Sequence, residues 1–346
     1  MSAAKPPIPP VFVVNTGRCG STLMSRMLAL HPAILSISEF LAALTSEALT
    51  ADRLDGEAFW RLIVRPRPIL VALFRAGIRQ PEILYRQGRH GPWPLSETPP
   101  IMLITLPFVS DAPDRLLAAL ESEVRAWPPD GLGRQIGRLF DTLADRLDRR
   151  RWVERSGDSL PYVERLARLF PEARFIHLYR DGRDVAVSMR GHSDFRSKTA
   201  YCAMLEKCGV DPYRQDRAFG VAGGHVWVER LMARLLPIRM LADARVSLAQ
   251  CGRHWSRQIE SGVEALARLD PARVMALRYE DLVATPDEAC RRLSAFLGID
   301  DGIEAWIERA RALPAARDRT WRDLPADDRQ ALDNACRSGL DLLGYS

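Results

Sequence analysis

The 346-residue sequence predicts an α/β fold, in which helices flank a central, mostly parallel sheet that carries a helical insertion. Two observations predict it. Short apolar, β-branched runs alternate with segments of helical periodicity, first near the N-terminus and again after residue 150. Between these regions, over residues 40–150, helical periodicity dominates. We therefore expect a single domain over residues 1–346, with 40–150 forming a helical insertion or cap within it.

The first unit of the predicted sheet lies at residues 11–37. An apolar strand over 11–14 leads into the loop NTGRCG, and a helix is predicted from Ser21 to Leu30, ended by His31 and Pro32. Residues 33–37 predict a second buried strand. A strand, a loop, a helix and another strand in this order are typical of the start of a parallel sheet.

The same alternation returns after residue 150. Strands are predicted over 151–155, 173–179 and 273–279, and helices over 159–170, 182–190, 225–241, 250–268 and 287–297. Residues 191–224 combine Gly, Asp, Ser and Pro with weak periodicity, which favours a loop or lid. Within the insertion, helical periodicity is strongest over 40–64, 113–127 and 132–149, and the C-terminal part is expected to be helical.

The composition excludes several classes of protein. A formal net charge of +5 is mild for this length and argues against a dedicated nucleic-acid binder. Six cysteines without a C-x-x-C pair and six scattered histidines provide no zinc-site spacing. The apolar runs are too short for a signal peptide or a membrane span. We therefore expect a soluble, cytoplasmic protein with no metal, no nucleic-acid partner and no membrane span.

The stretch VNTGRCGSTL, residues 14–23, predicts an anion site. A helix that begins after a buried strand presents unpaired backbone N–H groups, here those of residues 20–23, and its dipole attracts negative charge. Gly17 and Gly20 let the backbone approach a ligand closely, Arg18 adds a forked cation, and residues 1–38 contain no Asp or Glu. The plainer alternative is a strand-to-helix turn capped by a serine.

This loop differs from the ATP/GTP-binding loop G-x-x-x-x-G-K-[ST]. The segment between its glycines is too short, and no lysine precedes Ser21. The later strands also lack a clean magnesium-binding Asp at their ends, because FIHLYRD and ALRYED place a basic or aromatic residue before the acid. A metal-dependent kinase or NTPase is therefore disfavoured, and it is kept as an alternative.

Two further segments change the interpretation of the loop. FIHLYRDGRDVAVSM (175–189) predicts a strand, a charged turn and a helix, and LRYEDLVATP (277–286) follows downstream. Together with TGRCGSTL, in this order, they resemble the sulfotransferases that use 3′-phosphoadenosine 5′-phosphosulfate (PAPS). The resemblance covers about 11–39 and 151–298. It implies a P-loop NTPase-like sulfotransferase fold, PAPS as co-substrate, and transfer of a sulfuryl group to an acceptor hydroxyl without a metal.

The resemblance also implies a role for each matching position. The loop would bind the 5′-phosphosulfate, and Arg18 would stabilise charge during transfer. Arg180 and Ser188, eight residues apart, match the pair that holds the 3′-phosphate, and Tyr279 matches a tyrosine near the nucleotide. The expected nucleotide-binding residues are Arg18, Cys19, Gly20, Ser21, Thr22, Leu23, Arg180, Ser188 and Tyr279.

Glu39 is the expected general base. The tyrosylprotein branch of the family has a Glu about 21 residues after the loop arginine, and LALHPAILSISEF reproduces that arrangement. The cytosolic branch uses a His instead, so His192 is a weaker alternative, although it does not occupy the same place. A helix N-terminal acid is the plainer interpretation of Glu39. Arg155 stands where many relatives have a catalytic lysine, and it would take that residue's place. The expected catalytic residues are therefore Glu39, Arg18 and Arg155.

The function and the acceptor stay open at this point. A kinase or NTPase, or a non-catalytic nucleotide-binding protein on the same scaffold, are the alternatives to a sulfotransferase. A small-molecule, lipid or sugar hydroxyl is the expected acceptor, with a protein tyrosine as a further candidate. The C-terminal basic-Gly nucleotide clamp of the cytosolic branch is absent, and ARDRTWRDL (316–324) is a candidate substitute for it.

Overall fold

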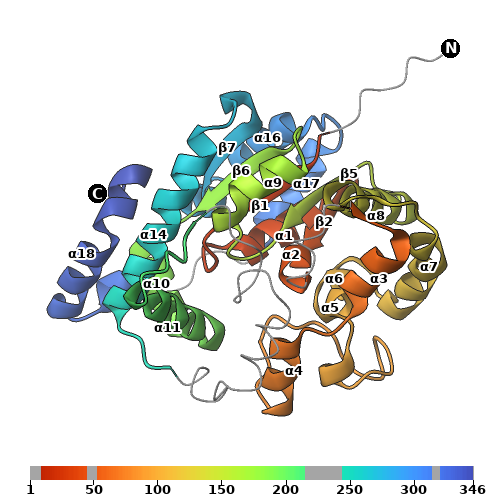
Figure 1. Cartoon of the computed structure of the whole chain (residues 1–346). Coiled ribbons are helices and arrows are strands. Elements are labelled where there is room, and N and C mark those ends of the chain that lie inside the picture. Colours follow the sequence, from red (N-terminus) through yellow and green to blue (C-terminus); the bar gives the residue numbers. More distant parts are fainter. Residues whose placement is uncertain (1–8, 45–52, 215–243, 314–319, 346) are drawn as a thin grey trace.

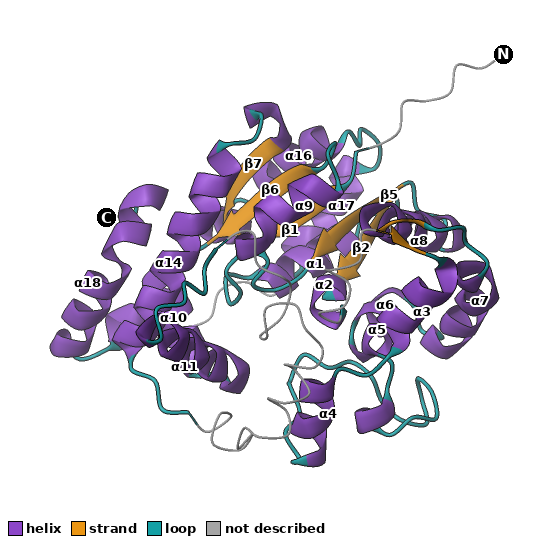
Figure 2. Ribbon diagram, viewed as in Figure 1, coloured by secondary structure: helices purple, strands orange, loops and turns teal. Residues whose placement is uncertain are grey.

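The structure is a computed structural model that describes residues 9–44, 53–214, 244–313 and 320–345. The predicted helix over 225–241 and part of the predicted lid lie outside these residues. Figure 2 shows the strands as one central layer with helices around it. The expected α/β class is therefore confirmed.

The main sheet has five parallel strands in the order β2-β5-β1-β6-β7. The central strand pairs on both sides: Val13 lies opposite Arg155 on one neighbour and Ile176 on the other. All five predicted strands are present, with boundaries within one residue of the prediction. They are β1 (Val11–Val14), β2 (Ile34–Ser38), β5 (Arg151–Arg155), β6 (Arg174–Tyr179) and β7 (Val274–Arg278).

Helices cover both faces of this sheet (Figure 1). On one face, α1 (Ser21–Ala29) packs against α17 (Ile303–Arg311), where Trp306 Nε1 donates a hydrogen bond to the carbonyl of Met27 at 2.6 Å. On the other face, α8 (Leu132–Arg146), α9 (Val163–Leu169) and α14 (Leu248–Ala267) contact one another in turn. The β1-to-β2 and β5-to-β6 crossovers run in opposite directions, so right-handed crossovers place α1 and α9 on opposite faces.

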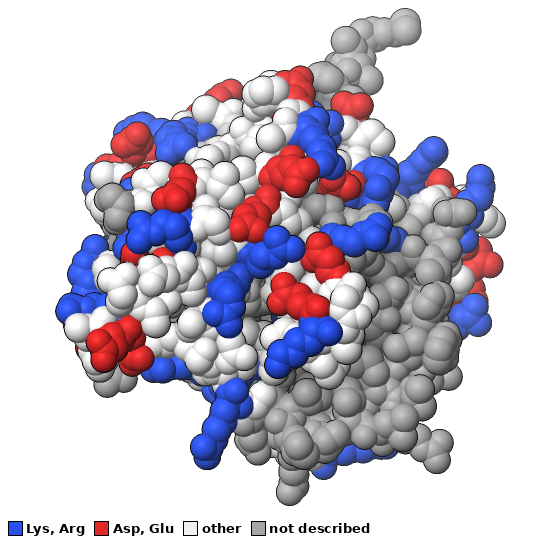
Figure 3. Space-filling model, turned by 60° about the vertical axis from the view of Figure 1, so that its left-hand side comes forward, with Lys and Arg blue, Asp and Glu red and all other residues white. Residues whose placement is uncertain are grey.

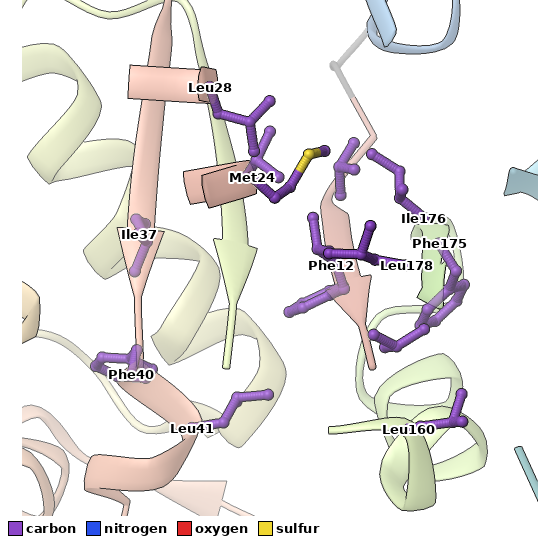
Figure 4. Close-up of a cluster of buried hydrophobic side chains, with 14 of the residues drawn as sticks. Phe12, Met24, Leu28, Ile37, Phe40, Leu41, Leu160, Phe175, Ile176 and Leu178 are labelled. Atoms are coloured by element: carbon purple, nitrogen blue, oxygen red, sulfur yellow. The ribbon is translucent and has the colours of Figure 1, made fainter. Parts of the chain in front are cut away.

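The core forms around β1 because both of its faces are covered. All four of its residues are fully buried, as expected for a central parallel strand. The Phe12 ring lies 5.0 Å from that of Phe170 and 6.1 Å from that of Phe175. Figure 4 shows Met24 extending from α1 toward β1. Each buried side chain of this size contributes about 1.5–3 kcal/mol, so this cluster fixes the strand from which the loop at residues 15–20 emerges.

The segment between β2 and β5 is helical, as predicted. A short antiparallel pair that the sequence analysis did not predict joins its two ends, β3 (Arg53–Leu54) with β4 (Asp130–Gly131). Its helices are α2 (Phe40–Ala43), α3 (Gly56–Val64), α4 (Pro68–Arg75), α5 (Pro100–Leu103), α6 (Thr105–Val109), α7 (Pro113–Arg125) and α8, with the 3-10 turn η2 (Leu95–Glu97). Gln135 supports the pair by donating from Nε2 to the carbonyls of Leu54 (2.7 Å) and Pro128 (2.9 Å).

The prediction of a loop or lid over 191–224 is wrong for its first part, because α11 (Ser193–Lys207) is a helix of four turns. Its apolar residues are scattered around the helix rather than gathered on one side, which explains the weak periodicity. Residues 193–207 contain no Gly or Pro, although the rest of the predicted lid does. Asp194 and Lys207 lie in the first and last turns of α11, where they complement the helix dipole. α11 packs against α10 (Gly182–Arg190) and α14, which supplies the stabilisation that its own pattern does not reveal.

The C-terminal region is helical, as expected. Its elements are α15 (Tyr279–Ala284), α16 (Pro286–Leu297), α17 and α18 (Ala326–Leu343), with the 3-10 turns η4 (Pro271–Arg273) and η5 (Trp321–Asp323). A further 3-10 turn, η3 (Leu160–Tyr162), precedes α9. Helix α18 packs along α14 (Figure 1). Among the described residues, every helix is too short or too polar to cross a membrane. On the face shown in Figure 3, basic and acidic side chains are intermingled rather than gathered by sign, in line with the mild net charge.

Candidate active site

The carboxyl ends of the five parallel strands meet at one edge of the sheet, and the residues that follow them converge there. β1 leads into the loop at 15–20, β2 into Glu39, β5 into Ser156, β6 into Arg180 and β7 into Tyr279. β1 connects to β2 on one side, whereas its other neighbour, β6, connects to β7 on the opposite side. Open α/β sheets bind ligands at such a switch point. The segments that the sequence analysis selected therefore lie at the expected place.

Asn15 holds the loop after β1 in shape. Its side-chain oxygen accepts a hydrogen bond from the Gly17 N–H at 2.8 Å, and its amide donates to the carbonyl of Ser156 at 3.0 Å. The buried amide thus ties the loop to the end of β5. α1 then begins at Ser21, with Gly20 as its N-cap and no acid in its first turn. The N–H groups of this first turn lack intrahelical acceptors, so they and the helix dipole favour an anion at this end.

The two loop glycines are required by their surroundings. Gly17 has φ +73°, and a Cβ there would lie 2.3 Å from the Phe195 ring. Gly20 has φ +88°, and a Cβ there would lie 2.1 Å from the Tyr279 ring. The left-handed backbone and these close contacts both exclude a larger residue. The glycines thus allow α11 and α15 to close tightly on the loop.

Arg18 lies at the centre of the loop and contacts three other parts of the chain. Its φ of 55° is left-handed, which costs about 1–2 kcal/mol for a residue with a Cβ. Its Nε donates to Ser188 Oγ at 3.1 Å, and its Nη1 donates to Glu82 Oε1 at 3.1 Å. The guanidinium lies 5.9 Å from the centre of the Phe195 ring. Arg18 therefore links the loop to α10, to α11 and to the segment between β2 and β5.

One face of α10 carries the second predicted motif. Asp184 and Ser188, four residues apart, lie along one side of the helix, and Arg180 lies in the turn just before it. Arg180 Nη2 donates to Asp184 Oδ2 at 3.1 Å, and its guanidinium lies 4.7 Å from the centre of the Tyr279 ring. Arg180 Nε is buried without a hydrogen-bond partner among the described residues. Because Tyr279 also covers Gly20, the structure brings Arg180, Tyr279 and the loop together.

Glu39 is held at the end of β2 by the neighbouring strand β5. Its backbone is left-handed, with φ 58°, and its N–H donates to the carbonyl of Arg155 at 2.9 Å. Its carboxylate pairs with Arg155 Nη1, and accepts hydrogen bonds from the Gly157 N–H at 3.0 Å and 3.2 Å. Arg155 in turn donates from Nε to Ser25 Oγ and from Nη2 to Ser38 Oγ, both at 2.7 Å. Glu39 is therefore fixed in orientation, with 17% of its side chain exposed.

A second acid, Glu154, lies near this pair in the interior of the protein. It is fully buried, and accepts hydrogen bonds from Ser156 Oγ at 2.6 Å and from the Leu41 N–H at 3.4 Å. Burial raises the pKa of Glu154 to about 8, and the nearby charge of Glu39 raises it further. Glu154 is therefore largely protonated at neutral pH and leaves the negative charge of this corner on Glu39.

A cavity of about 230 Å³ opens between these elements. Its polar lining consists of Gly17, Arg18, Ser21, Thr22, Glu39, Gln80, Glu82, Arg155, Gly157, His192 and Asp194. Its apolar wall consists of Leu70, Ile83, Pro100, Leu103, Ile104 and Phe195, most of them from the segment between β2 and β5. The predicted base, the loop arginine and an apolar wall thus surround one space that can hold a small organic group.

The remaining predicted residues differ in how far they are buried. Cys19 is fully buried, and burial raises the pKa of its thiol to about 12, so only its backbone can face an anion. Leu23 packs against the core, whereas Thr22 is exposed. The alternative base His192 lines the cavity with its Nε2 2.9 Å from Glu82, but its Nδ1 is sealed from solvent. That burial disfavours His192 as the group that takes a proton from an acceptor.

Several residues at this edge escaped the sequence analysis. Glu82 lies in an irregular segment that no motif marks, and Asp194 and Phe195 lie in the part of the predicted lid that is helical. Lys198 pairs with Asp158, whose N–H donates to Asn15 Oδ1 at 3.4 Å. The rarity of lysine, with only three in the chain, was a signal that could have drawn attention to Lys198.

The proposed C-terminal substitute for a nucleotide clamp lies partly within the described residues, from 320 onward. The Trp321 N–H donates to Asp184 Oδ1 at 2.9 Å, next to the oxygen that pairs with Arg180. The Arg183 guanidinium lies 4.1 Å from the centre of the Trp321 ring, and pairs with Asp181 and Asp333. η5 is thus adjacent to the Arg180 side of the site. Within the part of the chain that the structure describes, no cluster of His, Cys, Asp and Glu could hold a metal ion.

The fold and this edge define a parallel α/β protein with a cavity at the carboxyl ends of its strands. A profile described as the Sulfotransferase family matches residues 113–218 and 228–302, which together are just over half of the chain. The chain therefore belongs to the sulfotransferase family. The match begins after the N-terminal loop, so it is independent of the motif around Arg18. No curated protein matches the sequence.

Solved structures with similar folds are also sulfotransferases. The sulfotransferase domain from the curacin biosynthetic pathway is 15% identical over 99% of both chains, with a TM-score of 0.46. The sulfotransferase domain of the Synechococcus PCC 7002 olefin synthase is 18% identical over 99% of this chain and 97% of that one, with a TM-score of 0.47. Sulfotransferase STF9 from Mycobacterium avium is 15% identical over 98% and 78%, with a TM-score of 0.44. The family assignment rests on the profile rather than on these distant similarities.

Proposed function

We propose that this sulfotransferase moves a sulfuryl group from PAPS to an acceptor hydroxyl, with Glu39 as general base. The observation that carries the proposal is the shared cavity, because Arg18 and the start of α1 line one side of it and Glu39 lines another. The donor's 5′ end would lie on the N–H groups of α1, and its 3′-phosphate would lie near Arg180 and Ser188. Tyr279, which contacts both Gly20 and Arg180, would lie between the two anionic ends.

In the proposed reaction, the acceptor oxygen attacks sulfur. A new O–S bond forms, the S–O bond to the 5′-phosphate breaks, and its electron pair stays on the phosphate. The proton of the hydroxyl goes to Glu39, which leaves a sulfate ester and adenosine 3′,5′-bisphosphate (PAP). Most of the catalysis is positioning and charge stabilisation, by analogy with phosphoryl transfer, and Arg18 would offset the charge that develops on the leaving oxygen.

The surroundings of Glu39 suit a base that must stay in one place. A carboxylate offers about four acceptor positions, and the contacts with Arg155 and Gly157 leave capacity for an acceptor proton. Every nitrogen of the Arg155 guanidinium group contacts Ser25, Ser38 or Glu39. Arg155 therefore serves in this proposal mainly to orient Glu39, and a direct contact with the leaving oxygen stays a prediction.

The acceptor in this proposal is a hydroxyl of a small molecule, a lipid or a sugar, with a protein tyrosine as the alternative. The apolar wall between Leu70 and Ile104 favours an acceptor with an apolar body. We also propose that the chain forms one cytoplasmic domain in which residues 40–150 act as the cap over the acceptor. No metal is required, because backbone N–H groups and arginines supply the positive charge.

A thermal-shift comparison tests the donor. PAP at a hundredfold excess over its dissociation constant should stabilise the protein by about 2.7 kcal/mol without magnesium, whereas ATP with magnesium should not. Incubation with PAPS and a panel of alcohols and phenols, 4-nitrophenol among them, should then release PAP and add a sulfate mass to one acceptor. Stabilisation by ATP with magnesium alone would favour a kinase or NTPase. PAP binding without transfer to any acceptor would favour a non-catalytic nucleotide-binding protein.

A further inference from the structure

Glu82 occupies a position between the donor and acceptor sides of the cavity. Its Oε1 accepts a hydrogen bond from Arg18 Nη1 at 3.1 Å and lies 2.9 Å from His192 Nε2. Burial acts to raise the pKa of Glu82, but the hydrogen bond and charge of His192, together with the charge of Arg18, hold it below its usual value. The carboxylate is therefore ionised at neutral pH and carries its full charge beside Arg18.

The backbone around Glu82 is fixed rather than loosely placed. Ile83, the next residue, is buried, and the N–H groups of Leu84 and Tyr85 both donate to the carbonyl of Leu103, at 3.0 Å and 3.1 Å. Arg79 Nη2 donates to the carbonyl of Tyr85 at 2.9 Å. The carboxylate is thus presented to Arg18 by an ordered segment.

An anion on Arg18 would share the guanidinium with Glu82. Two negative groups on one partly buried cation repel each other, with side-chain exposures of 20% for Arg18 and 35% for Glu82. His192 gives the carboxylate a second partner, so Glu82 can leave Arg18 without losing every hydrogen bond. Ser188 does not compete with an anion in this way, because its hydroxyl is neutral. It can keep accepting the hydrogen bond from Arg18 Nε while an anion binds the rest of the guanidinium.

We propose that Glu82 is a positioning residue that competes with the anionic end of the donor for Arg18 and moves onto His192 when the donor binds. This inference rests on the proposed function, because the competing anion is the 5′ end of PAPS or PAP. Glu82 lowers the affinity for both nucleotides and thereby speeds the release of PAP. His192 has the opposite effect, since it offers Glu82 an alternative partner when an anion occupies Arg18.

Titration calorimetry with PAP tests this competition. Glu82→Gln removes the negative charge and should bind PAP about five times more tightly, as expected from the loss of one partly exposed ion pair. His192→Asn removes the nitrogen that faces Glu82 and should bind PAP more weakly than the wild type. A gain in affinity cannot result from damaged folding, so the Glu82→Gln result stays interpretable if His192→Asn proves unstable.

Two controls separate competition from net charge. Glu97→Gln makes the same charge change at an exposed position of the same segment, and should leave the affinity for PAP unchanged. In an Arg18→Ala background, Glu82→Gln should no longer improve the affinity, because the shared cation is gone. An equal gain in Glu97→Gln, or a gain that persists without Arg18, would overturn the inference.

The outcomes distinguish this inference from the function on which it rests. If the wild type fails to bind PAP, the proposed function and the competition both fall. If the wild type binds PAP and Glu82→Gln binds it no more tightly, only the competition falls, and Glu82 is a structural partner of Arg18.

Discussion

Replacing Glu39 by Gln tests the proposal that this carboxylate takes a proton from the acceptor. Glu39 pairs with Arg155 and accepts hydrogen bonds from the Gly157 N–H, and it faces the cavity from the end of β2. Glutamine keeps the size of the side chain and removes both the charge and the ability to take a proton. In the proposed mechanism this change acts on the chemical step and leaves the donor contacts at Arg18 and Arg180 in place.

The expected magnitudes follow from these contacts. Loss of a general base should lower the turnover number by about 10²–10⁴. Both groups around the Glu39 carboxylate are donors, so one of them would face the amide N–H₂ of glutamine and lose its acceptor. One such unmet buried donor costs about 1–3 kcal/mol of stability. The variant should therefore be less stable but folded, with an unchanged affinity for PAP.

The assay is the single-turnover rate at saturating PAPS, with the acceptor that the panel identifies and at a temperature where both proteins are folded. Calorimetry with PAP runs in parallel, and Glu39→Asp serves as the control that keeps a carboxylate while shortening its reach. Near wild-type turnover in Glu39→Gln would refute the assignment of the base. A large loss of PAP affinity would instead show that Glu39 acts on the donor site.

Three further changes test the donor site and the buried acid. Gly20→Ala should lower the free energy of unfolding in urea by about 2 kcal/mol or more and weaken PAP binding, because the left-handed backbone and the Tyr279 ring leave no room for a Cβ. A variant as stable as the wild type would contradict this close contact. Arg180→Ala should weaken PAP binding about 10- to 100-fold, measured by calorimetry, and unchanged affinity would remove Arg180 from the 3′-phosphate site. Because the pKa of Glu154 is raised to about 8, the folded protein keeps a proton that the unfolded chain has lost at neutral pH. The free energy of unfolding should therefore fall by about 1.4 kcal/mol for each pH unit as the pH rises toward 8. Glu154→Gln should flatten that slope between pH 6.5 and 8, while the exposed Glu172→Gln should keep it.

The strands and the shape of the loop after β1 could be predicted because their signals are local. The run at 11–14 is apolar because both faces of β1 are covered, and the glycines at 17 and 20 mark two of the three left-handed positions of the loop, with Arg18 as the third. The charged turn at 180–184 follows β6 directly, so sequence order alone places it at the same edge as the loop. Parallel topology turns these local patterns into a shared edge without any knowledge of long-range contacts.

The acceptor side could not be predicted in the same way. Glu82 reaches Arg18 across 64 positions of sequence, and its segment has neither a period nor a motif. α11 was missed because its apolar residues are scattered around the helix, so its stability comes from contacts with α10 and α14. The role of Arg155 also depends on partners from other elements, since Ser25 lies on α1 and Ser38 ends β2.

The cavity is lined by two sets of groups, one from the sheet edge and one from the segments that cover it, and this difference bears on how acceptor specificity can change. The groups expected to hold the donor come from the sheet edge, where the end of each strand fixes their positions. Most of the groups that line the rest of the cavity come from the β2–β5 segment and from α11, which contact the loop after β1 through side chains such as Glu82 and Phe195. Changes in these segments can therefore reshape the acceptor cavity while the loop after β1 stays intact. In the proposed competition Glu82 is the exception, because through its contact with Arg18 the acceptor side would also determine how tightly the donor is held.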